Sequence, residues 1–275
     1  MESTDIAVII VSYNNLGTEC LSSLSEAISK TNYPTKVLVV DNNSTDLEVH
    51  EKVPEYLPDA KVIIREKNYG FGRSMNFAAE RIDAKYYFLL NPDTNLVDPE
   101  ILNKLVDYLE ARPDTGLIAP KLRNFDGSRQ DSCRRFPAWH MPIVQRTWFN
   151  KTEWGQKYIK HFLMHDFDQS CETSVDWVQG SAMFIPSYVW RLVNGFDDRF
   201  WMYFEDVDLC RRIWQTGYRV TYLPDIVIHH AFQRASAQIN NLLLNVIKTR
   251  ATRAHIASWF KYLWKWRGQS IESRI

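Results

Sequence analysis

The sequence lacks the features that would place it in a specialised class of protein. Its 275 residues contain only four cysteines, far apart and without a C-x-x-C pair, which argues against a zinc site and a disulfide framework. No apolar run approaches the length that spans a bilayer. The run at 6–11 is too short for a signal peptide, and no basic residue precedes it. We therefore expect a cytoplasmic protein with reduced thiols.

Charge of neither sign dominates, but its distribution is uneven. Lys and Arg number 33, as do Asp and Glu, and this balance gives no sign of a nucleic-acid partner. From Asn240 onward, however, seven basic residues stand against one acidic residue. An acidic body thus precedes a basic tail, which is also rich in aromatic residues.

The tail from about residue 238 is predicted to be helical with two apolar faces. One face would hold Ile239, Leu243, Val246, Ala257, Phe260 and Trp264, and the other Trp259, Tyr262, Leu263 and Trp266. Trp, Tyr, Lys and Arg are typical of membrane interfaces. We therefore expect one face to pack on the body, with Trp259 and Trp266 at the headgroups of an anionic membrane. The alternatives are a fully packed terminal helix and a homodimer contact.

The N-terminal half alternates strand and helix signals. Short runs of β-branched or aromatic residues suit strands buried on both faces of a parallel sheet, at 6–12, 36–42, 61–66 and 86–93. Helical stretches separate them at about 15–31, 45–57, 72–83 and 98–111. This alternation predicts an α/β domain.

Polar clusters follow three of these strands, with the sequences SYNN, DNNSTD and NPDT. Ligands of open α/β sheets bind outside the carboxyl ends of the strands, so the three clusters are expected to share one site. Any single cluster is equally typical of a turn or a helix cap.

The second half is less regular. Residues 133–170 show no clear periodicity and are predicted to form a long, partly ordered segment. A strand at 175–185, a helix at 187–193 and a final strand or two at 218–230 are expected after it.

The stretch WMYFEDVDLCRR at 201–212 is predicted to start a helix that ends near Gly217. Acidic residues favour the first turn of a helix, where backbone N–H groups are unpaired. Asp208 is also spaced to pair with Arg211 or Arg212. These structural roles leave open whether the carboxylates have a chemical one.

Seven motifs along the chain occur in a family's order and at its usual separations. They are VIIVSYNN (8–15), VVDNNSTD (39–46), NYGFGRSMN (68–76), LLNPDT (89–94), VDWVQGSAM (175–183), GFDDRFWMYFEDVDLCRR (195–212) and VIHHAFQRAS (227–236). As a set they resemble inverting nucleotide-sugar glycosyltransferases of family 2, which have the GT-A fold. They are most similar to bacterial rhamnosyltransferases, which build O-antigen and related cell-surface polysaccharides from dTDP-L-rhamnose.

The resemblance covers about 1–236 and implies a GT-A domain with a mixed, mainly parallel sheet flanked by helices. It implies a nucleotide-binding half at about 1–122 and an acceptor-binding half at about 123–236, followed by the tail at 237–275. Asp41 would accept a hydrogen bond from a pyrimidine N3–H, although it could instead cap the following helix. The implied donor-binding residues are Ser12, Tyr13, Asn14, Asp41, Asn68, Gly70, Gly72, Asn76, Asn91 and Asp93.

The motif NPDT stands where the family has its D-x-D metal motif. Its first position is Asn91, so only Asp93 offers a carboxylate. Mg²⁺ or Mn²⁺ prefers hard oxygen ligands and often binds one carboxylate with diphosphate oxygens, so a single Asp is sufficient. The resemblance gives the second metal contact to His229 or His230, and His229 is favoured.

Transfer with inversion is a single displacement, which needs a base near the acceptor hydroxyl and a neutralised diphosphate. Asp206 matches the family's base. Glu205 would orient the acceptor or the base, and Trp177 and Gly180 would border the acceptor sugar.

The implied reaction moves L-rhamnose from dTDP-L-rhamnose to a lipid-linked or growing glycan at the inner face of the cytoplasmic membrane. The alternatives are the same fold with a UDP-sugar donor and a non-catalytic binding protein of similar fold. A sugar-phosphate nucleotidyltransferase would need a glycine-rich loop with basic residues near the N-terminus, which the segment VSYNNLGTE does not supply.

Overall fold

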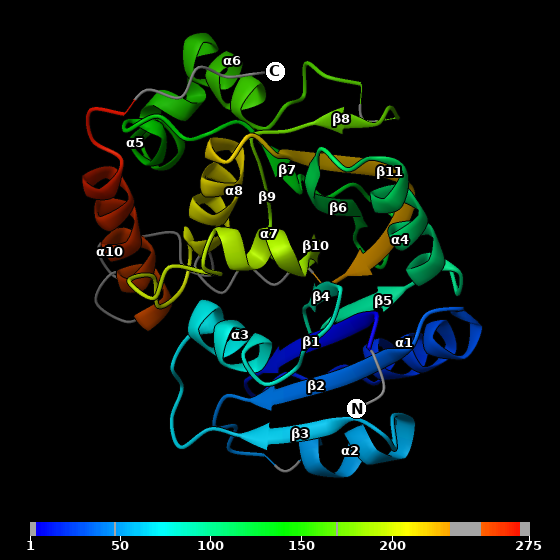
Figure 1. The fold of residues 1–275 in the computed structure, drawn as a ribbon. Coiled ribbons are helices and arrows are strands. Elements are labelled where there is room, and N and C mark those ends of the chain that lie inside the picture. Colours follow the sequence, from blue (N-terminus) through cyan, green and yellow to red (C-terminus); the bar gives the residue numbers. More distant parts are fainter. Residues whose placement is uncertain (1–3, 47, 169, 232–248, 270–275) are drawn as a thin grey trace.

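A mixed β-sheet forms the centre of the molecule (Figure 1). The computed structural model describes residues 4–46, 48–168, 170–231 and 249–269. Within them, the sheet has nine strands in the order β3-β2-β1-β4-β10-β6-β11-β5, with β8 paired to β11. The strands are β1 Ile6–Ser12, β2 Thr35–Asp41, β3 Lys61–Ile64, β4 Tyr86–Leu90, β5 Thr94–Leu96, β6 Thr115–Arg123, β8 Thr173–Ser174, β10 Ala182–Pro186 and β11 Arg219–His230. A separate small sheet pairs β7 Cys133–Arg134 with β9 Trp177–Val178.

The sheet is mixed, because four of its eight strand pairings are parallel and four are antiparallel. β1 pairs in parallel with β2 and β4, β2 with β3, and β6 with β11. β10 runs antiparallel between β4 and β6, and β5 and β8 each run antiparallel to β11. The two halves predicted on either side of residue 122 therefore share one continuous sheet.

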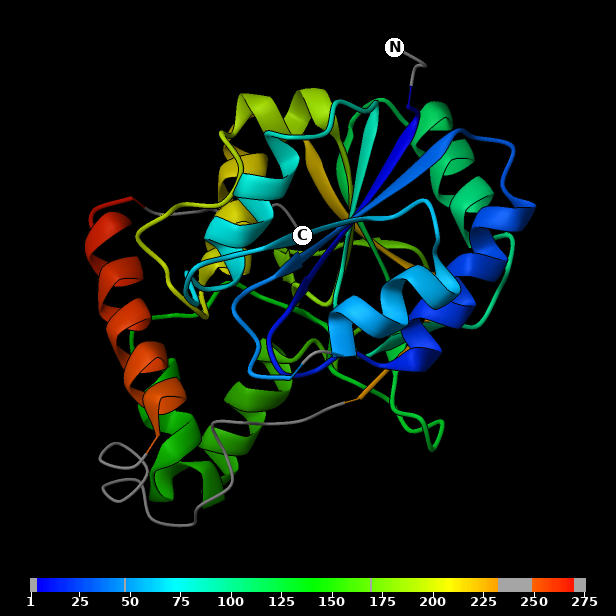
Figure 2. The same cartoon turned by 90° about the horizontal axis from the view of Figure 1, so that it is seen from below.

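Helices cover both faces of the sheet (Figure 2). They are α1 Thr18–Lys30, α2 Glu48–Tyr56, α3 Phe71–Ala79, α4 Ile101–Ala111, α5 Met141–Arg146, the 3-10 helix η1 Trp148–Lys151, α6 Glu153–Phe162, α7 Ser187–Leu192, α8 Glu205–Gln215 and α10 Arg250–Lys265. Alternate residues of β1 serve the two faces: Ile6, Val8 and Ile10 pack with α1, α2 and α4, whereas Ala7, Ile9 and Val11 pack with α3, α7 and α8. Burial on both faces explains why this strand is apolar at every position but the last.

Two expectations for the second half are wrong. The segment 175–185 is not one strand, because the turn around Gly180 separates β9 from β10. Between residues 133 and 168, where no regular elements were expected, the chain forms β7, α5, η1 and α6. Met141 and Phe162 bury their side chains in the core cluster of the body and so hold this segment in place.

The tail helix α10 packs on the body through one face. Tyr262 and Trp266 are only 2% and 7% exposed, whereas Phe260 and Trp264 are 59% and 68% exposed. The expectation that Trp266 lies at lipid headgroups is therefore wrong, because that ring faces the core. The predicted helical residues Ile239, Leu243 and Val246 lie outside the described residues. Across the described parts of the chain, every helix is too short or too polar to cross a membrane.

Candidate functional site

The carboxyl ends of β1 and β2 bring two of the predicted polar clusters together. Ser12 and Asp41 are partners in the parallel register. The Asn14 side chain accepts a hydrogen bond from the Thr45 backbone N–H at 2.7 Å, and the Asn14 backbone donates to the Ser44 hydroxyl at 2.9 Å. Asp41 is 2% exposed, and its Oδ1 accepts from the Ser44 N–H at 2.8 Å. One Asp41 oxygen thus caps a turn, while Tyr13 beside it is 47% exposed.

Asn42 organises the approach to α3, although no sequence argument singled it out. Its side-chain amide donates to Asn68 Oδ1 at 2.9 Å. Its Oδ1 accepts from the Tyr69 N–H and the Ser74 hydroxyl, each at 3.0 Å. Because Asn42 is 2% exposed, these bonds are shielded from water, and they fix the loop in which Asn68 lies.

The two glycines of NYGFGRSMN allow a close approach, but to the chain itself. Gly70 has a φ of 89°, and a Cβ there would lie 1.9 Å from the Trp201 carbonyl oxygen. A Cβ on Gly72 would meet the Phe196 Cβ at 3.0 Å. The start of α3 therefore packs directly on the loop before α8, whereas the resemblance implies that both glycines bind the donor.

The motif NPDT meets the paired histidines through strand register. β5 and β11 run antiparallel, with Thr94 opposite His230. His230 is 4% exposed, and its Nε2 lies 3.3 Å from Asp93 Oδ1 and 3.5 Å from Asn91 Nδ2. His229, favoured from the sequence, instead contacts the Phe125 ring at 6.0 Å. The geometry therefore favours His230 as the partner of Asp93.

Gln130 fixes the tautomer of His230. The Gln130 side-chain nitrogen donates to the His230 carbonyl oxygen at 2.6 Å, which orients the amide because a carbonyl can only accept. Gln130 Oε1 then faces His230 Nδ1 at 3.0 Å, so this ring nitrogen carries a proton. Nε2 is left free to face Asp93.

Asp93 and His230 fit one divalent cation that is also held by diphosphate oxygens. The pair combines a carboxylate with an imidazole whose other nitrogen is hydrogen-bonded, which is the usual outer-shell support of a metal ligand. No set of three or more His, Cys, Asp or Glu residues gathers as a metal cluster in the described parts of the chain. A cation bound here would therefore need oxygen atoms from the substrate or from water to complete its coordination.

Asp206 lies in the first turn of α8, beside the Gly180 turn. Its Oδ2 accepts from the Gly180 N–H at 3.2 Å, and its Oδ1 accepts from the Val207 N–H at 2.8 Å. The next residue along, Ser181, accepts a bond from the Asn91 N–H at 2.8 Å. Backbone bonds thus link the carboxylate of Asp206 to the Asp93 motif.

Burial changes the acidity of the two carboxyl groups at the start of α8. It raises the pKa of Asp206, against hydrogen bonds from Val207 and Gly180 and the charge of Arg134. Burial and the charge of Asp206 raise the pKa of Glu205 well above its usual value. Among the described residues, Glu205 Oε2 is buried with no hydrogen-bond partner. A raised pKa suits a group that must accept a proton near neutral pH.

The backbone immediately before α8 is strained, and α10 braces it. Tyr203 and Phe204 both have a φ of 67°, a conformation that costs a bulky residue about 1–2 kcal/mol. Ser258 of α10 donates to the Met202 carbonyl at 2.8 Å, and the His255 ring contacts both aromatic rings, at 5.0 and 5.5 Å. The helix α10 therefore helps to hold the loop that immediately precedes α8 and Asp206.

A buried ionic network joins α10 to α8. Asp208 is fully buried and accepts from Lys265 Nζ at 2.8 Å, Arg212 Nε at 2.8 Å and Trp266 Nε1 at 2.9 Å. Lys265 also donates to Asp197 at 2.6 Å. The predicted pairing of Asp208 is thus with Arg212, and its role is structural.

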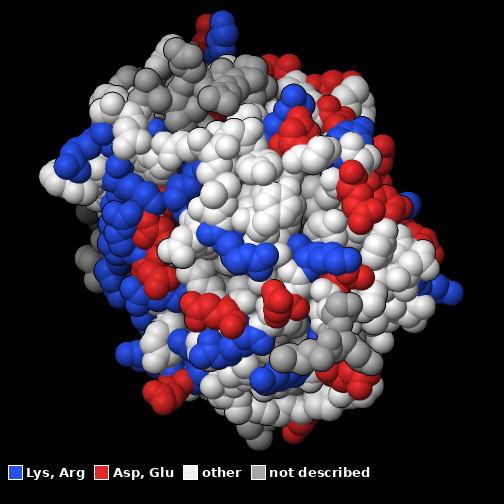
Figure 3. Space-filling model, in the orientation of Figure 1, with Lys and Arg blue, Asp and Glu red and all other residues white. Residues whose placement is uncertain are grey.

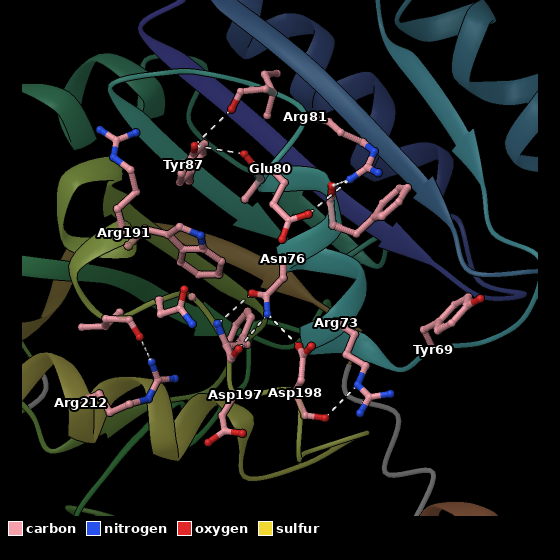
Figure 4. A pocket seen from close by; sticks show the side chains of 18 of the residues that line it. Tyr69, Arg73, Asn76, Glu80, Arg81, Tyr87, Arg191, Asp197, Asp198 and Arg212 are labelled. Atoms are coloured by element: carbon pink, nitrogen blue, oxygen red, sulfur yellow. Dashed lines mark hydrogen bonds and ion pairs between the residues drawn. The ribbon is translucent and has the colours of Figure 1, made fainter.

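Asn76, expected at the donor, has its amide bound elsewhere. It donates to the Phe196 carbonyl at 2.8 Å and to Asp198 at 3.0 Å, and it accepts from the Phe196 N–H at 2.9 Å. It lines a hollow of about 1280 Å³ beside α3 (Figure 4). Charged side chains around this hollow form hydrogen bonds with other residues of the protein. Arg73, for example, donates to the Asp198 carbonyl at 2.8 Å.

Comparison with known proteins identifies the family. The model of glycosyl transferase family 2 matches residues 7–170, more than half of the chain. The chain belongs to this family. It is therefore a glycosyltransferase, as the seven motifs implied.

Two relatives of this glycosyltransferase are named as rhamnosyltransferases. An N-acetylglucosaminyl-diphospho-decaprenol L-rhamnosyltransferase of Mycobacterium tuberculosis is 30% identical over 225 residues, covering 76% of this chain and 70% of that protein. Rhamnosyltransferase WbbL of Escherichia coli K12 is 29% identical over 267 residues, covering 94% of this chain and 92% of that protein.

A solved structure confirms the expected α/β fold of the glycosyltransferase. GalNAc-T7 with UDP, GalNAc and Mn²⁺ aligns with a TM-score of 0.66 at 16% identity. The alignment covers 95% of this chain and 48% of that protein, so the chain spans about half of its length. At this identity the likeness concerns the fold alone.

Trp177 of the glycosyltransferase lies in the core, whereas the sequence suggested that it borders an acceptor. It is 6% exposed, and its indole N–H donates to the Arg135 carbonyl at 2.8 Å. Sequence reasoning also missed Gln130 and Arg134. Neither belongs to a recognised motif, and only the fold brings them to His230 and Asp206.

Proposed function

We propose that the protein is an inverting rhamnosyltransferase that moves L-rhamnose from dTDP-L-rhamnose to a hydroxyl of a lipid-linked or growing glycan. One observation carries this proposal: His230 Nε2 faces Asp93 Oδ1 at 3.3 Å, and backbone bonds through Asn91, Ser181 and Gly180 connect this pair to the carboxylate of Asp206. The reaction needs a binding site for the donor diphosphate and a general base. In this arrangement Asp93 and His230 would provide the first, and Asp206 would provide the second. The relatives named as L-rhamnosyltransferases support the choice of sugar.

Asp206 is the proposed general base. Gly180 and Val207 bond both of its oxygens from the backbone, so the carboxylate has a defined orientation before an acceptor binds. Its raised pKa makes it a better proton acceptor from a sugar hydroxyl than an ordinary aspartate. Glu205, with its unpartnered buried oxygen, would bind a further acceptor hydroxyl.

Asp93 and His230 would hold Mg²⁺ or Mn²⁺ on the donor diphosphate. When bound, the cation would neutralise charge on the departing nucleotide. The chain contributes a carboxylate oxygen and His230 Nε2, whose direction is set by Gln130.

The nucleotide is proposed to lie at the carboxyl ends of β1 and β2. Asp41 Oδ1 bonds Ser44, so recognition of a base N3–H falls to Oδ2, which lies 4.0 Å from His50. Tyr13 is exposed beside it and can stack on a base. Both thymine and uracil offer an N3–H, so this contact does not select between dTDP and UDP.

We also propose that the protein acts at the inner face of the cytoplasmic membrane, as a peripheral protein. A lipid-linked acceptor is found there, and the basic tail suits an anionic surface.

The base assignment is tested by Asp206→Asn, which keeps the shape of the side chain. We expect dTDP binding to stay unchanged while transfer falls about 100-fold or more. Product formation with dTDP-L-rhamnose and with UDP-sugars is measured by chromatography. Transfer within a few-fold of the wild type would remove Asp206 as the base, and a preference for a UDP-sugar would overturn the donor.

A further inference from the structure

The outer side of α5, η1 and α6 carries a group of exposed aromatic residues. Trp139, Trp148 and Trp154 are 65%, 66% and 57% exposed, and Ile143 and Phe149 are 41% and 37% exposed. The ring centroids of Trp148 and Phe149 are 4.2 Å apart, and those of Phe149 and Trp154 are 6.5 Å apart. We call these five residues the aromatic shelf. Single exposed apolar residues are common, but a cluster of this kind marks an interaction surface.

The shelf is a built feature of the fold. A Cβ on Gly155 would lie 1.9 Å from the Phe149 carbonyl oxygen, so only glycine allows η1 and α6 to pack this closely. Thr152 caps α6 by accepting from the Gly155 N–H at 3.1 Å. The inner residues of the segment are buried, so its aromatic rings are held outward.

Positive charge accompanies the shelf. Residues 139–160 contain four Lys and Arg and one acidic residue, and α10 exposes Arg250, Arg253 and Lys261 and contains no acidic residue. Both figures of the fold place α10 and α5 on the same side of the molecule (Figures 1 and 2). Lys and Arg gather over the α10 region in the space-filling view (Figure 3). Phe260 and Trp264 add exposed rings to this side.

We propose that the aromatic shelf and the exposed face of α10 together dock on a bilayer that contains anionic lipid. Trp rings settle at the headgroup level of a bilayer, and basic residues bind anionic headgroups. A second copy of the chain is a poorer partner, because a symmetric contact would place like charges opposite one another. The proposal deepens the membrane location proposed above and gives it a defined surface.

Co-sedimentation of the full chain with vesicles tests the surface. We use phosphatidylcholine vesicles with and without phosphatidylglycerol. The wild type is expected to bind the anionic vesicles and to be partly released by salt. Trp148→Ala with Trp154→Ala should weaken binding by on the order of 10-fold, while Val97→Ala with Leu192→Ala, two exposed apolar residues elsewhere, should leave it unchanged.

A second test of the surface changes its charge and leaves the tryptophans in place. Lys157→Gln with Lys160→Gln changes two exposed residues and is not expected to affect folding. At about 1 kcal/mol for each basic residue, binding should fall about 30-fold. Unchanged vesicle binding by both double variants would overturn the proposal. If the tryptophan variant instead converts a wild-type dimer to monomer in sedimentation velocity without losing vesicle binding, the partner is a second copy.

Transfer to a water-soluble acceptor separates this proposal from the proposed reaction. Loss of vesicle binding with normal transfer supports the docking surface. Normal vesicle binding by a protein with no rhamnosyl transfer refutes only the reaction.

Discussion

Replacing Asp208 by Asn should destabilise the protein severely, although Asp208 is not expected to touch a substrate. The carboxylate is fully buried and balances Lys265 and Arg212, which are 15% and 16% exposed. Asparagine has nearly the same volume, so the change creates no cavity and removes only the charge. Breaking a buried ionic cluster by removing one member costs about 3–5 kcal/mol, because the remaining charges stay desolvated.

Asp197 limits the size of this loss. Burial by itself raises the pKa of Asp197, but hydrogen bonds from Arg199 and Lys265 outweigh that effect and hold the pKa well below its usual value. Asp197 therefore stays charged at neutral pH and continues to balance Lys265 in the variant. Arg212 bonds Asp208 and the neutral Val193 carbonyl, and the described residues give it no second carboxylate. We accordingly expect the lower part of the range, about 3 kcal/mol.

Urea unfolding followed by tryptophan fluorescence measures the free energy directly. A loss of about 3 kcal/mol corresponds to a fall in Tm of roughly 6–12 °C in a chain of this size. Asp225→Asn is the matched control, since Asp225 is exposed and should change stability by less than about 0.5 kcal/mol. A loss below about 1 kcal/mol for Asp208→Asn would show that the network contributes little and that other contacts hold α10.

Three further outcomes concern the site. Asp41→Ala should weaken dTDP and UDP binding to a similar extent in calorimetry, and unchanged binding would remove Asp41 from the nucleotide site. Gln130→Leu should free the orientation of His230 and weaken Mn²⁺ binding about 10-fold or more, measured on the protein with dTDP; equal Mn²⁺ affinity would contradict the role given to Gln130. Arg134→Gln removes a charge that lowers the pKa of Asp206. The acid limb of the pH–rate profile should therefore move to higher pH, with the lost activity recovered as pH rises, and an unmoved limb would refute that coupling.

The N-terminal part of the fold could be predicted because β1, β2 and β4 are largely buried on both faces. A continuous run such as Ile6 to Val11 is unusual outside a covered parallel strand, and its length sets the element bounds closely. The polar residues that follow such strands share one edge for the same topological reason. Asp206 could be singled out as a candidate because the family motif that holds it is long.

The rest could not be predicted because it depends on register or on distant contacts. Whether His229 or His230 faces Asp93 is decided by β11, whose pairing with β6 shifts between Leu223 and Val227. A shift of one residue exchanges the two faces of a strand, and the local sequence does not reveal it.

The helices α5 and α6 could not be predicted, because the apolar residues of their segment are irregularly spaced. The segment with α5 and α6 has large aromatic residues on its solvent side, so its apolar residues do not follow the helical period of a core-facing stripe. Gln130 lies 100 residues from His230 in sequence, and only the folded chain brings the two together.

The packing of α10 on the loop before Asp206 limits how freely such tails can be exchanged among relatives. Its inner positions, His255, Ser258, Tyr262 and Trp266, contact that loop or α8 and must be inherited together with them. Its outer positions, Phe260 and Trp264, have no such partner requirement and are free to vary with the surface that they meet. A chimera whose α10 keeps these inner positions should retain glycosyl transfer. A chimera in which α10 is replaced entirely by the helix of a relative should lose transfer even if it folds.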